Sequence, residues 1–363
     1  MFRLLRPDSI KVLKDEKARR SLPRYFAVME GALPSKWDIS KNIEVGIDLD
    51  EDMESLWRAH SEGMDSLKVI QGDIDSGKIS LEKLKKSKTS LLDLKIELAE
   101  RMLESCEFCE RKCGKNRKEG EKGFCKVGYD PLLSSEFLHY GEEPELVPSH
   151  TIFFCGCPFY CIYCQNYTIS RHIEAGMVVP PKKMAYVIDE RRRRESRNVN
   201  WVGGSPTPNL HYILKTLREC KEDIPSVWNS NMYMSEKAME LLAGTQDVYL
   251  ADFKYGDIKC ALRLSKVPRY LEVVKRNHKL AFEQAELIIR HLVLPNHLEC
   301  CTKNVLNWIA ENLSGDARVN VMFQYRPMFR AGEYEIINRR LNSGEMERAL
   351  EIAEESGLKN VIT

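Results

Sequence analysis

Three cysteines stand at a spacing that suits metal chemistry. Cys157, Cys161 and Cys164 form a C-x3-C-x2-C run in a loop bent by Gly156 and Pro158. Three thiolates that turn inward suit a soft metal centre, and an iron–sulfur cube needs four ligands. One iron of such a cube would lack a protein thiolate and would be free to bind another molecule. The spacing therefore predicts a 4Fe–4S cluster with one open iron, in preference to three structural cysteines.

Four further thiols lie upstream, at Cys106, Cys109, Cys113 and Cys125, with glycines between them that allow tight turns. Tetrahedral zinc would be satisfied by this set with no open position, and it would then be structural. A second iron–sulfur cluster is also chemically possible and could relay electrons to the first. The sequence leaves both alternatives open.

The remaining cysteines show no such pattern. Cys155 would give a C-x5-C register, which fits no cluster loop, so we interpret it as a packing residue of the preceding strand. Cys220, Cys260, Cys300 and Cys301 are scattered along the chain, and we interpret them as ordinary small apolar residues.

Polar residues and paired glycines follow apolar strands at several points. The candidates for a binding site are Gly203, Gly204, Ser230, Asn231, Asp252, Lys254 and Arg290. Burying such polar side chains without partners is costly, and a ligand with carboxylate, amine and hydroxyl groups would supply partners. For Asp252 and Lys254 the alternative is a mutual salt bridge, and for His291 it is a place in the core.

These candidates need a scaffold that brings strand ends together. Apolar, β-branched strands are predicted at 151–155, 199–203, 226–230, 247–253, 287–294, 318–325 and 359–362. Helices are predicted at 183–193, 208–221, 235–243, 268–285, 301–313 and 344–356. This alternation favours an α/β fold with a parallel sheet, wound as a full or partial barrel that carries its chemistry at the carboxyl ends of its strands. A doubly wound open sheet is the alternative, but no G-x-G-x-x-G follows the first strand.

The chain before this barrel divides into two parts. Residues 1–105 contain charged stretches of helical period without a catalytic constellation, so we expect a helical N-terminal extension. Residues 106–150 are rich in glycine, lysine and cysteine, which predicts a metal-binding loop segment. The core barrel would then occupy 151–363.

Composition limits the classes of function. The chain is 43% hydrophobic with a net charge of +1, so no global field favours nucleic acid or a membrane surface. The run Arg191–Arg194 is interpreted as a solvated helix face. No apolar run reaches the roughly 18 residues of a membrane span. We expect a cytoplasmic protein, whose 12 cysteines serve as metal ligands and not as disulfides.

An aromatic residue, Tyr163, directly precedes the third cysteine of the loop and completes a pattern that resembles the radical S-adenosylmethionine (SAM) superfamily. From about 106 to 330 the chain is similar to homologues of pyruvate formate-lyase activating enzyme. The matching stretches are Cys106–Cys125, Tyr140–Pro144, Thr151–Ser170, Asn229–Tyr233, Asp247–Lys254, Arg290–Pro295 and Gln324–Pro327. The resemblance implies a partial (β/α)6 barrel of the TIM type, a 4Fe–4S cluster on the three loop cysteines, and SAM across the barrel mouth.

The resemblance also implies roles for the strand-end residues. Gly203 and Gly204 match glycines that meet the SAM amino group. Ser230 and Asn231 match a Thr-Asn pair. Asp252 and Lys254 match an Asp-x-Lys near SAM, and Arg290 matches an arginine that lines the SAM site. Two positions depart from the pattern: Ser205 replaces an acidic residue after the glycine pair, and Met232 stands where glycine is usual.

By resemblance, the chain would reductively cleave SAM to a 5′-deoxyadenosyl radical and activate a glycyl-radical enzyme. An electron donor such as ferredoxin or flavodoxin is then implied as a partner. The alternative enzyme modifies a small molecule, a peptide or RNA. The alternative outside catalysis is an iron–sulfur electron carrier or a zinc-pinned scaffold, which has no use for polar strand ends.

Overall fold

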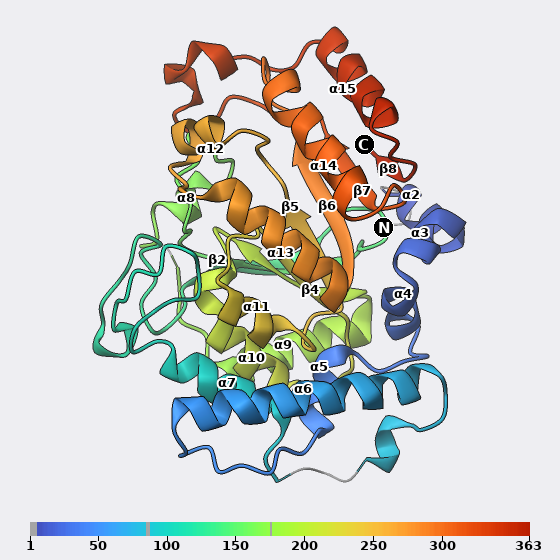
Figure 1. Ribbon diagram of the computed structural model, residues 1–363, viewed down its shortest axis with the longest axis vertical. Coiled ribbons are helices and arrows are strands. Elements are labelled where there is room, and N and C mark those ends of the chain that lie inside the picture. The colour runs from blue at the N-terminus through green and yellow to red at the C-terminus, as the bar shows by residue number, and fades with distance from the viewer. Residues whose placement is uncertain (1–5, 85–87, 175) are drawn as a thin grey trace.

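A single eight-stranded sheet organises the chain, in the spatial order β1 to β8 (Figure 1). The computed structural model describes residues 6–84, 88–174 and 176–363, so residues 1–5 and 85–87 of the predicted extension lie outside it. The strands are β1 Leu133–His139, β2 Ser149–Phe154, β3 Asn198–Gly203, β4 Ser226–Ser230, β5 Val248–Asp252, β6 Glu286–Leu292, β7 Arg318–Met322 and β8 Val361–Ile362. Strands β2 to β8 run parallel, while β1 pairs antiparallel with β2.

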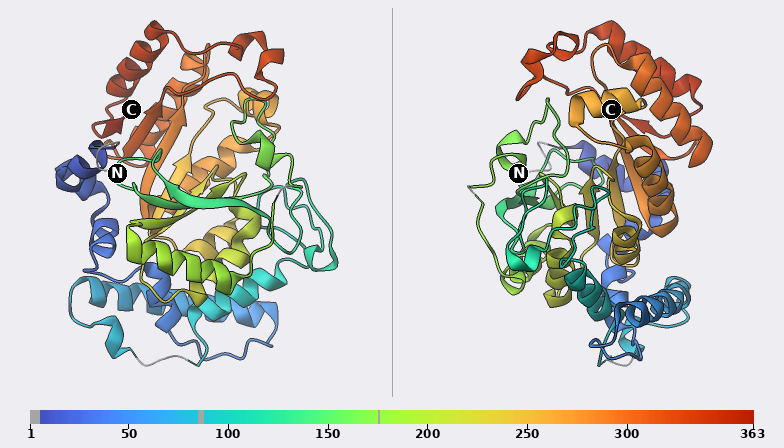
Figure 2. Two further views of the ribbon diagram at one scale, coloured as in Figure 1. Left: turned by 180° about the vertical axis from the view of Figure 1, so that it is seen from behind. Right: turned by 60° about the vertical axis from the view of Figure 1, so that its left-hand side comes forward.

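The seven parallel strands confirm the predicted order of strands and the partial barrel. The antiparallel strand β1 was not expected, because 106–150 was interpreted as loop, and that interpretation is wrong for Leu133–His139. Only alternate positions of β1 are shielded from solvent, as in an edge strand. Seen from behind, β1 and β2 lie across the strands that follow them (Figure 2).

Helices follow the strands on the outer face of the sheet, and α11, α13 and α14 lie in front of it in Figure 1. Their bounds are α8 Tyr167–Ser170, α9 Pro181–Arg194, α10 Leu210–Glu219, α11 Glu236–Leu242, α12 Ile258–Ser265, α13 Tyr270–Gln284, α14 Asn304–Asn312 and α15 Ser343–Glu355. A π-helical turn, η5 Leu298–Lys303, leads into α14. All six predicted helices are present, and α8, α12 and η5 were not predicted. None of the helices in the described residues is long and apolar enough to span a membrane.

The N-terminal residues are helical, as predicted. The helices are α2 Asp8–Lys11, α3 Glu16–Ser21, α4 Pro23–Met29, α5 Lys36–Asn42, α6 Met53–Asp75 and α7 Leu91–Arg101. Helices α6 and α7 run across the bottom of Figure 1, and α2 to α4 lie at its right-hand side. Buried side chains of α5 to α7, such as Trp37 and Leu98, join the same apolar core as Leu214 of α10. The N-terminal helices therefore share the core of the barrel.

The concave face of the sheet holds a second, smaller core. On this face Val227, Leu250 and Ile288 of neighbouring strands pack with Tyr25 and Phe26 of α4. The hydroxyl of Tyr25 donates to the carbonyl oxygen of Glu145 at 3.1 Å and accepts from the amide of Asn198 at 3.0 Å. Helix α4 thus closes the barrel at the amino ends of its strands, which leaves the carboxyl ends for a site.

Candidate active site at the carboxyl ends of the strands

The loop with three cysteines leaves the end of β2 through Gly156. This glycine has φ +85°, and a Cβ there would lie 2.5 Å from the carbonyl oxygen of Cys125 and 2.5 Å from Cγ2 of Val127. A side chain is excluded by both conformation and space. The cysteine loop and the upstream cysteine segment are therefore packed directly on each other.

Backbone hydrogen bonds hold the loop from two other parts of the barrel. The amides of Tyr160 and Ile162 donate to the carbonyl oxygens of Ser265 and Leu264, each at 2.9 Å. The amide of Arg330 donates to the carbonyl oxygen of Ile162 at 2.8 Å. The end of α12 therefore positions the middle of the cysteine loop.

The protein supplies a polar contact to each of the three sulfurs. Cys157 Sγ accepts from the amide of Phe159 at 3.4 Å and from Asn231 Nδ2 at 3.8 Å. Cys161 Sγ accepts from the hydroxyl of Ser265 at 2.9 Å. Cys164 Sγ lies 3.5 Å from the hydroxyl of Ser170. Such contacts stabilise thiolates and are the surroundings in which protein-bound clusters are found.

The separation of these thiols also fits a cluster. Their sulfurs do not all lie within 4.8 Å of one another, as the ligands of a single ion would. In a cube each thiolate binds a different iron, so a wider triangle is needed. Burial and the neighbouring Cys164 raise the pKa of Cys161 to about 11, and burial raises that of Cys157 further. Metal binding must therefore displace these protons.

The glycine pair after β3 is required by the cysteine loop itself. Gly203 has φ +108°, and a Cβ there would lie 2.1 Å from the backbone nitrogen of Phe154. A Cβ on Gly204 would lie 2.2 Å from the carbonyl oxygen of Gly156. The pair brings the backbone after β3 into contact with the loop, beside the predicted SAM site. The predicted contact with the SAM amino group remains a prediction.

The residues after β4 converge on Cys157. Asn231 is buried, its Nδ2 faces the sulfur, and its Oδ1 has no hydrogen-bond partner within the described part of the chain. The hydroxyl of Ser230 accepts from the amide of Met232 at 3.1 Å and lies 3.5 Å from its sulfur. Met232 itself has φ +53°, a conformation that glycine adopts more easily. A buried amide oxygen without a partner is the type of group that a bound ligand would satisfy.

Asp252 and Lys254 form an ion pair at 2.6 Å between Oδ2 and Nζ, as the alternative from the sequence had it. Burial lowers the pKa of Lys254, but the carboxylate of Asp252 and the thiolates of Cys161 and Cys164 raise it above its usual value. The ammonium therefore lies between the carboxylate and the cysteine loop. His291 lies in the core, where it contacts the carbonyl oxygen of Phe253 at 2.8 Å.

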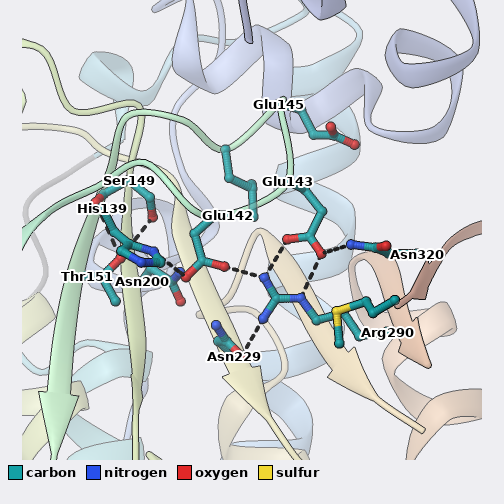
Figure 3. A network of polar contacts seen from close by, with 12 residues as sticks. His139, Glu142, Glu143, Glu145, Ser149, Thr151, Asn200, Asn229, Arg290 and Asn320 are labelled. Carbon is teal, nitrogen blue, oxygen red and sulfur yellow. Dashed lines mark hydrogen bonds and ion pairs between the residues drawn. The ribbon is translucent and has the colours of Figure 1, made fainter. Parts of the chain in front are cut away.

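Arg290 lies deeper in the barrel, where carboxylates from the segment before β2 reach it (Figure 3). Its Nε donates to Glu143 Oε1 at 2.7 Å, its Nη2 pairs with both Glu142 and Glu143, and its Nη1 lies 3.4 Å from Asn229 Oδ1. Asn320 Nδ2 donates to Glu143 Oε1 at 2.8 Å. Protein groups thus satisfy the guanidinium that we expected to line the SAM site.

The carboxylate of Glu142 in this layer is held ionised. Burial alone would raise the pKa of Glu142, but Arg290 and His139 together outweigh burial and lower the pKa to about 2. The sequence analysis did not identify either glutamate as a site residue. The one available signal was the stretch Tyr140–Pro144, which carries both.

A second group missed from the sequence is a chain of hydroxyls behind the cysteine loop. The hydroxyl of Tyr163 lies 2.6 Å from that of Tyr255, which lies 2.5 Å from that of Ser265. Ser265 in turn donates to Cys161. Since these residues come from separate elements, no local spacing predicts their contact.

The upstream cysteines lie next to the cysteine loop. The backbone of Cys109 forms an isolated antiparallel β-bridge with Met234, just beyond Asn231. The carbonyl oxygen of Cys125 packs directly against Gly156. Burial raises the pKa of Cys109 to about 12, whereas Cys113 is exposed. Zinc or a second cluster on these four thiols remains a prediction.

The sequence is similar to a known family and to two archaeal proteins. Residues 151–309 match the family model of the radical SAM superfamily. Uncharacterized protein MJ0674 of Methanocaldococcus jannaschii is 48% identical over 348 residues, which cover 93% of this chain and 98% of that protein. Uncharacterized protein MJ0808 of the same organism is 24% identical over 220 residues, which cover 53% of this chain and 61% of that protein.

Solved structures are more remote. SuiB of Streptococcus suis bound to its precursor peptide SuiA matches with a TM-score of 0.42 and 17% identity, over 55% of this chain and 43% of the SuiB chain. This chain therefore spans less than half of SuiB. Methylornithine synthase (PylB) matches with a TM-score of 0.43 and 12% identity, over 92% of this chain and 77% of that one.

Proposed function

Because residues 151–309 match the radical SAM superfamily model, we propose that the chain reductively cleaves SAM at a 4Fe–4S cluster held by Cys157, Cys161 and Cys164. The surroundings of the three sulfurs support the proposal. Each has a polar contact from the protein, and the unpartnered Oδ1 of Asn231 lies beside them. A loop of purely structural cysteines would have no need for that arrangement.

The residues around the cysteines have separate tasks. When bound, the cluster supplies the electron that splits the SAM sulfonium and yields a 5′-deoxyadenosyl radical. Lys254 places a positive charge near the thiolates of Cys161 and Cys164. Asn231 offers an amide oxygen to a ligand amine or hydroxyl, and the buried aromatic side chains of Phe159 and Tyr163 exclude water from the loop.

For the substrate we propose a glycine of a partner protein, so that the chain is a glycyl-radical activating enzyme supplied with electrons by a ferredoxin or flavodoxin. The support is the similarity of residues 106–330 to such enzymes. Modification of a small molecule or a peptide uses the same cluster and SAM residues, so these substrates are the competing outcome of the test.

The first test concerns the cluster. Anaerobically reconstituted protein should bind iron and sulfide and, with a reductant, convert SAM to 5′-deoxyadenosine. Replacing any one of Cys157, Cys161 or Cys164 by alanine should abolish this conversion. Cys155→Ala is the matched control, since Cys155 is buried in the adjacent position and should be dispensable. If Cys155→Ala is as inactive as Cys161→Ala, the assignment of the ligands is wrong.

Metal analysis of the same samples addresses the upstream thiols. Iron that persists when the three loop cysteines are replaced would indicate a second cluster on Cys106, Cys109, Cys113 and Cys125. Zinc that is lost only when these four cysteines are replaced would indicate a closed structural site.

The second test concerns the substrate. The reduced enzyme would be incubated with SAM and a candidate glycyl-radical enzyme encoded in the same genome, and the glycyl radical would be followed by electron paramagnetic resonance. A radical doublet that requires both proteins supports the activase. A genome without any glycyl-radical enzyme would remove this proposal and leave cluster-dependent SAM cleavage standing.

A further inference from the structure

Three cysteines that the sequence analysis interpreted as scattered apolar residues come together in the structure. Cys260 lies in α12, after β5, while Cys300 and Cys301 lie in the π-helical turn after β6. Cys260 Sγ lies 3.9 Å from Cys300 Sγ, and Cys300 Sγ lies 3.9 Å from Cys301 Sγ. These three cysteines are therefore scattered along the chain but adjacent in the fold.

A histidine completes the group. Among the described residues, Cys260, His297 and Cys300 are the only three cysteine, histidine or acidic side chains whose ligand atoms all lie within 4.8 Å of one another. Cys301 is the adjacent fourth candidate: its Sγ lies 3.9 Å from Cys300 Sγ, but it falls outside the set of ligand atoms that all lie within 4.8 Å of one another. His297 and Cys301 are buried, and Cys260 and Cys300 are partly exposed.

Two sulfur–sulfur distances match a single tetrahedral ion. Zinc–sulfur bonds of ~2.3 Å in a tetrahedron put neighbouring sulfurs about 3.8 Å apart. The separations of Cys260 Sγ from Cys300 Sγ and of Cys300 Sγ from Cys301 Sγ are both 3.9 Å. An iron–sulfur cube needs cysteine sulfurs that lie farther apart, as in the cysteine loop. Three thiols and an imidazole are also a known ligand set for structural zinc.

The tautomer of the imidazole suits this role. Nδ1 of His297 lies 2.7 Å from the carbonyl oxygen of Pro295, so Nδ1 carries the proton and Nε2 keeps its lone pair. Metal-binding histidines in proteins are commonly fixed by such a hydrogen bond from the other ring nitrogen.

The backbone is shaped to bring the two loops together. A Cβ on Gly256 would lie 2.6 Å from the carbonyl oxygen of Cys301 and 3.0 Å from that of Cys300. Only glycine permits that approach without displacement. The turn that carries both cysteines is π-helical, a rare geometry that is often found at functional sites.

We propose that Cys260, His297, Cys300 and Cys301 bind one zinc ion at the carboxyl side of β5 and β6, separate from both the cysteine loop and the upstream cysteines. The ion joins the loop after β5 to the turn after β6. It thereby fixes the start of α12, whose other end holds the cysteine loop through Leu264 and Ser265. This site does not depend on the proposed function.

The test is metal analysis of purified, anaerobically handled protein. Cys260→Ser and Cys300→Ser should each lower the zinc content by one equivalent relative to the wild type. Cys220→Ser is the matched control, because Cys220 is buried, lies in another part of the fold and should leave zinc unchanged. Any zinc on the upstream cysteines is common to all samples and cancels in the comparison. Equal zinc in the wild type, Cys260→Ser and Cys300→Ser would overturn the proposal.

A second measurement needs no variant and holds even if a substitution perturbs folding. Wild-type protein would be treated with iodoacetamide with and without prior removal of zinc by a chelator, and the modified cysteines identified by mass spectrometry. Zinc should protect Cys260 and Cys300 at least about tenfold in rate. Equal modification in both samples, or recovery of a Cys260–Cys300 disulfide in place of free thiols, would contradict the proposal.

Discussion

At the residue scale, Asp252 carries the most information about the SAM site. It pairs with Lys254 and stands opposite Arg290 in the register of β5 and β6. Arg290 is itself paired with Glu142 and Glu143, so Lys254 is the cation that Asp252 holds. Because Cys161 and Cys164 also act on the pKa of Lys254, the ion pair stands beside the cysteine loop, and this motivates a test of Asp252 itself.

Asp252→Asn keeps the size of the side chain and removes its charge. If the residue serves the SAM site, the variant should fold and keep its iron, while SAM affinity or the rate of SAM cleavage falls at least about tenfold, equivalent to ~1.4 kcal/mol. Equilibrium binding of SAM and the yield of 5′-deoxyadenosine measure the two effects.

The control for this prediction is Lys254→Met, which breaks the same ion pair from its other end. If both variants lose only thermal stability, to a similar extent, and SAM cleavage stays intact, the pair is structural. The functional role of Asp252 would then be withdrawn.

The residue scale also shows what sequence can and cannot predict about a site. The three loop cysteines were predictable because their chemistry depends on a local spacing. Glu142 lies 148 positions from its partner Arg290, and Cys260 lies 40 positions from Cys300. Such pairs follow from how the strands wind, which no short motif encodes.

At the element scale, α7 contains a lysine in an unusual place. Lys95 is fully buried between helices, with Nζ 2.7 Å from His60 Nε2 of α6 and 3.1 Å from the carbonyl oxygen of Glu240 in α11. Burial lowers the pKa of Lys95 to about 7. Burial and Lys95 lower the pKa of His60 to about 2, so the imidazole is neutral and accepts the hydrogen bond.

This lysine predicts a pH dependence of stability. The pKa of Lys95 in the folded chain, about 7, lies below the usual value of 10.5 for a lysine, so between pH 7 and pH 10.5 the unfolded chain binds more protons. Stability should therefore rise with pH across this window, by a few kcal/mol at most. Urea unfolding at pH 7 and pH 10 should show the rise, and Lys95→Met should remove it and stabilise the protein at pH 7.

Lys68→Met is the control, because Lys68 is exposed on α6 and its replacement should leave the pH dependence unchanged. An identical rise in Lys95→Met and the wild type would show that other groups cause it.

Elements differed in how well they could be predicted. The long helices α6 and α7 have clear apolar periodicity, and most parallel strands centre on apolar or β-branched residues. Strand β1 was missed because three consecutive polar residues, Ser134–Glu136, interrupt its apolar ones. Helix α12 has only eight residues, too few for periodicity to stand out beside a strand end.

At the scale of the whole molecule, the N-terminal helices are integrated into the barrel. The sequence offered no reason to attach α4 to the concave face of the sheet, since its apolar residues fit any buried helix. The structure packs Tyr25 and Phe26 against Val227 and Leu250. The helical extension is therefore expected to unfold together with the barrel.

Phe26→Ala tests this integration. Phe26 is 1% exposed, and truncating a buried phenylalanine costs about 3–5 kcal/mol. The free energy of unfolding, measured by urea with tryptophan fluorescence, should fall by that amount in a single transition. Phe282→Ala is the matched control: Phe282 is 46% exposed, and its replacement should change stability by less than about 0.5 kcal/mol. A separate early transition that leaves the barrel intact would show that α4 is an appendage.

Closure of the barrel at the amino ends of its strands has a consequence for the entry of substrates and the release of products. Helix α4 seals the amino ends of the strands, and the layer of Arg290, Glu142 and Glu143 fills the middle. In the described part of the chain, any molecule that reacts at the cysteine loop must then enter and leave the barrel at the carboxyl ends of the strands. We therefore expect an ordered catalytic cycle. The smaller substrate binds first, and the larger one binds second and blocks the entrance. Neither product is released until the larger molecule has dissociated.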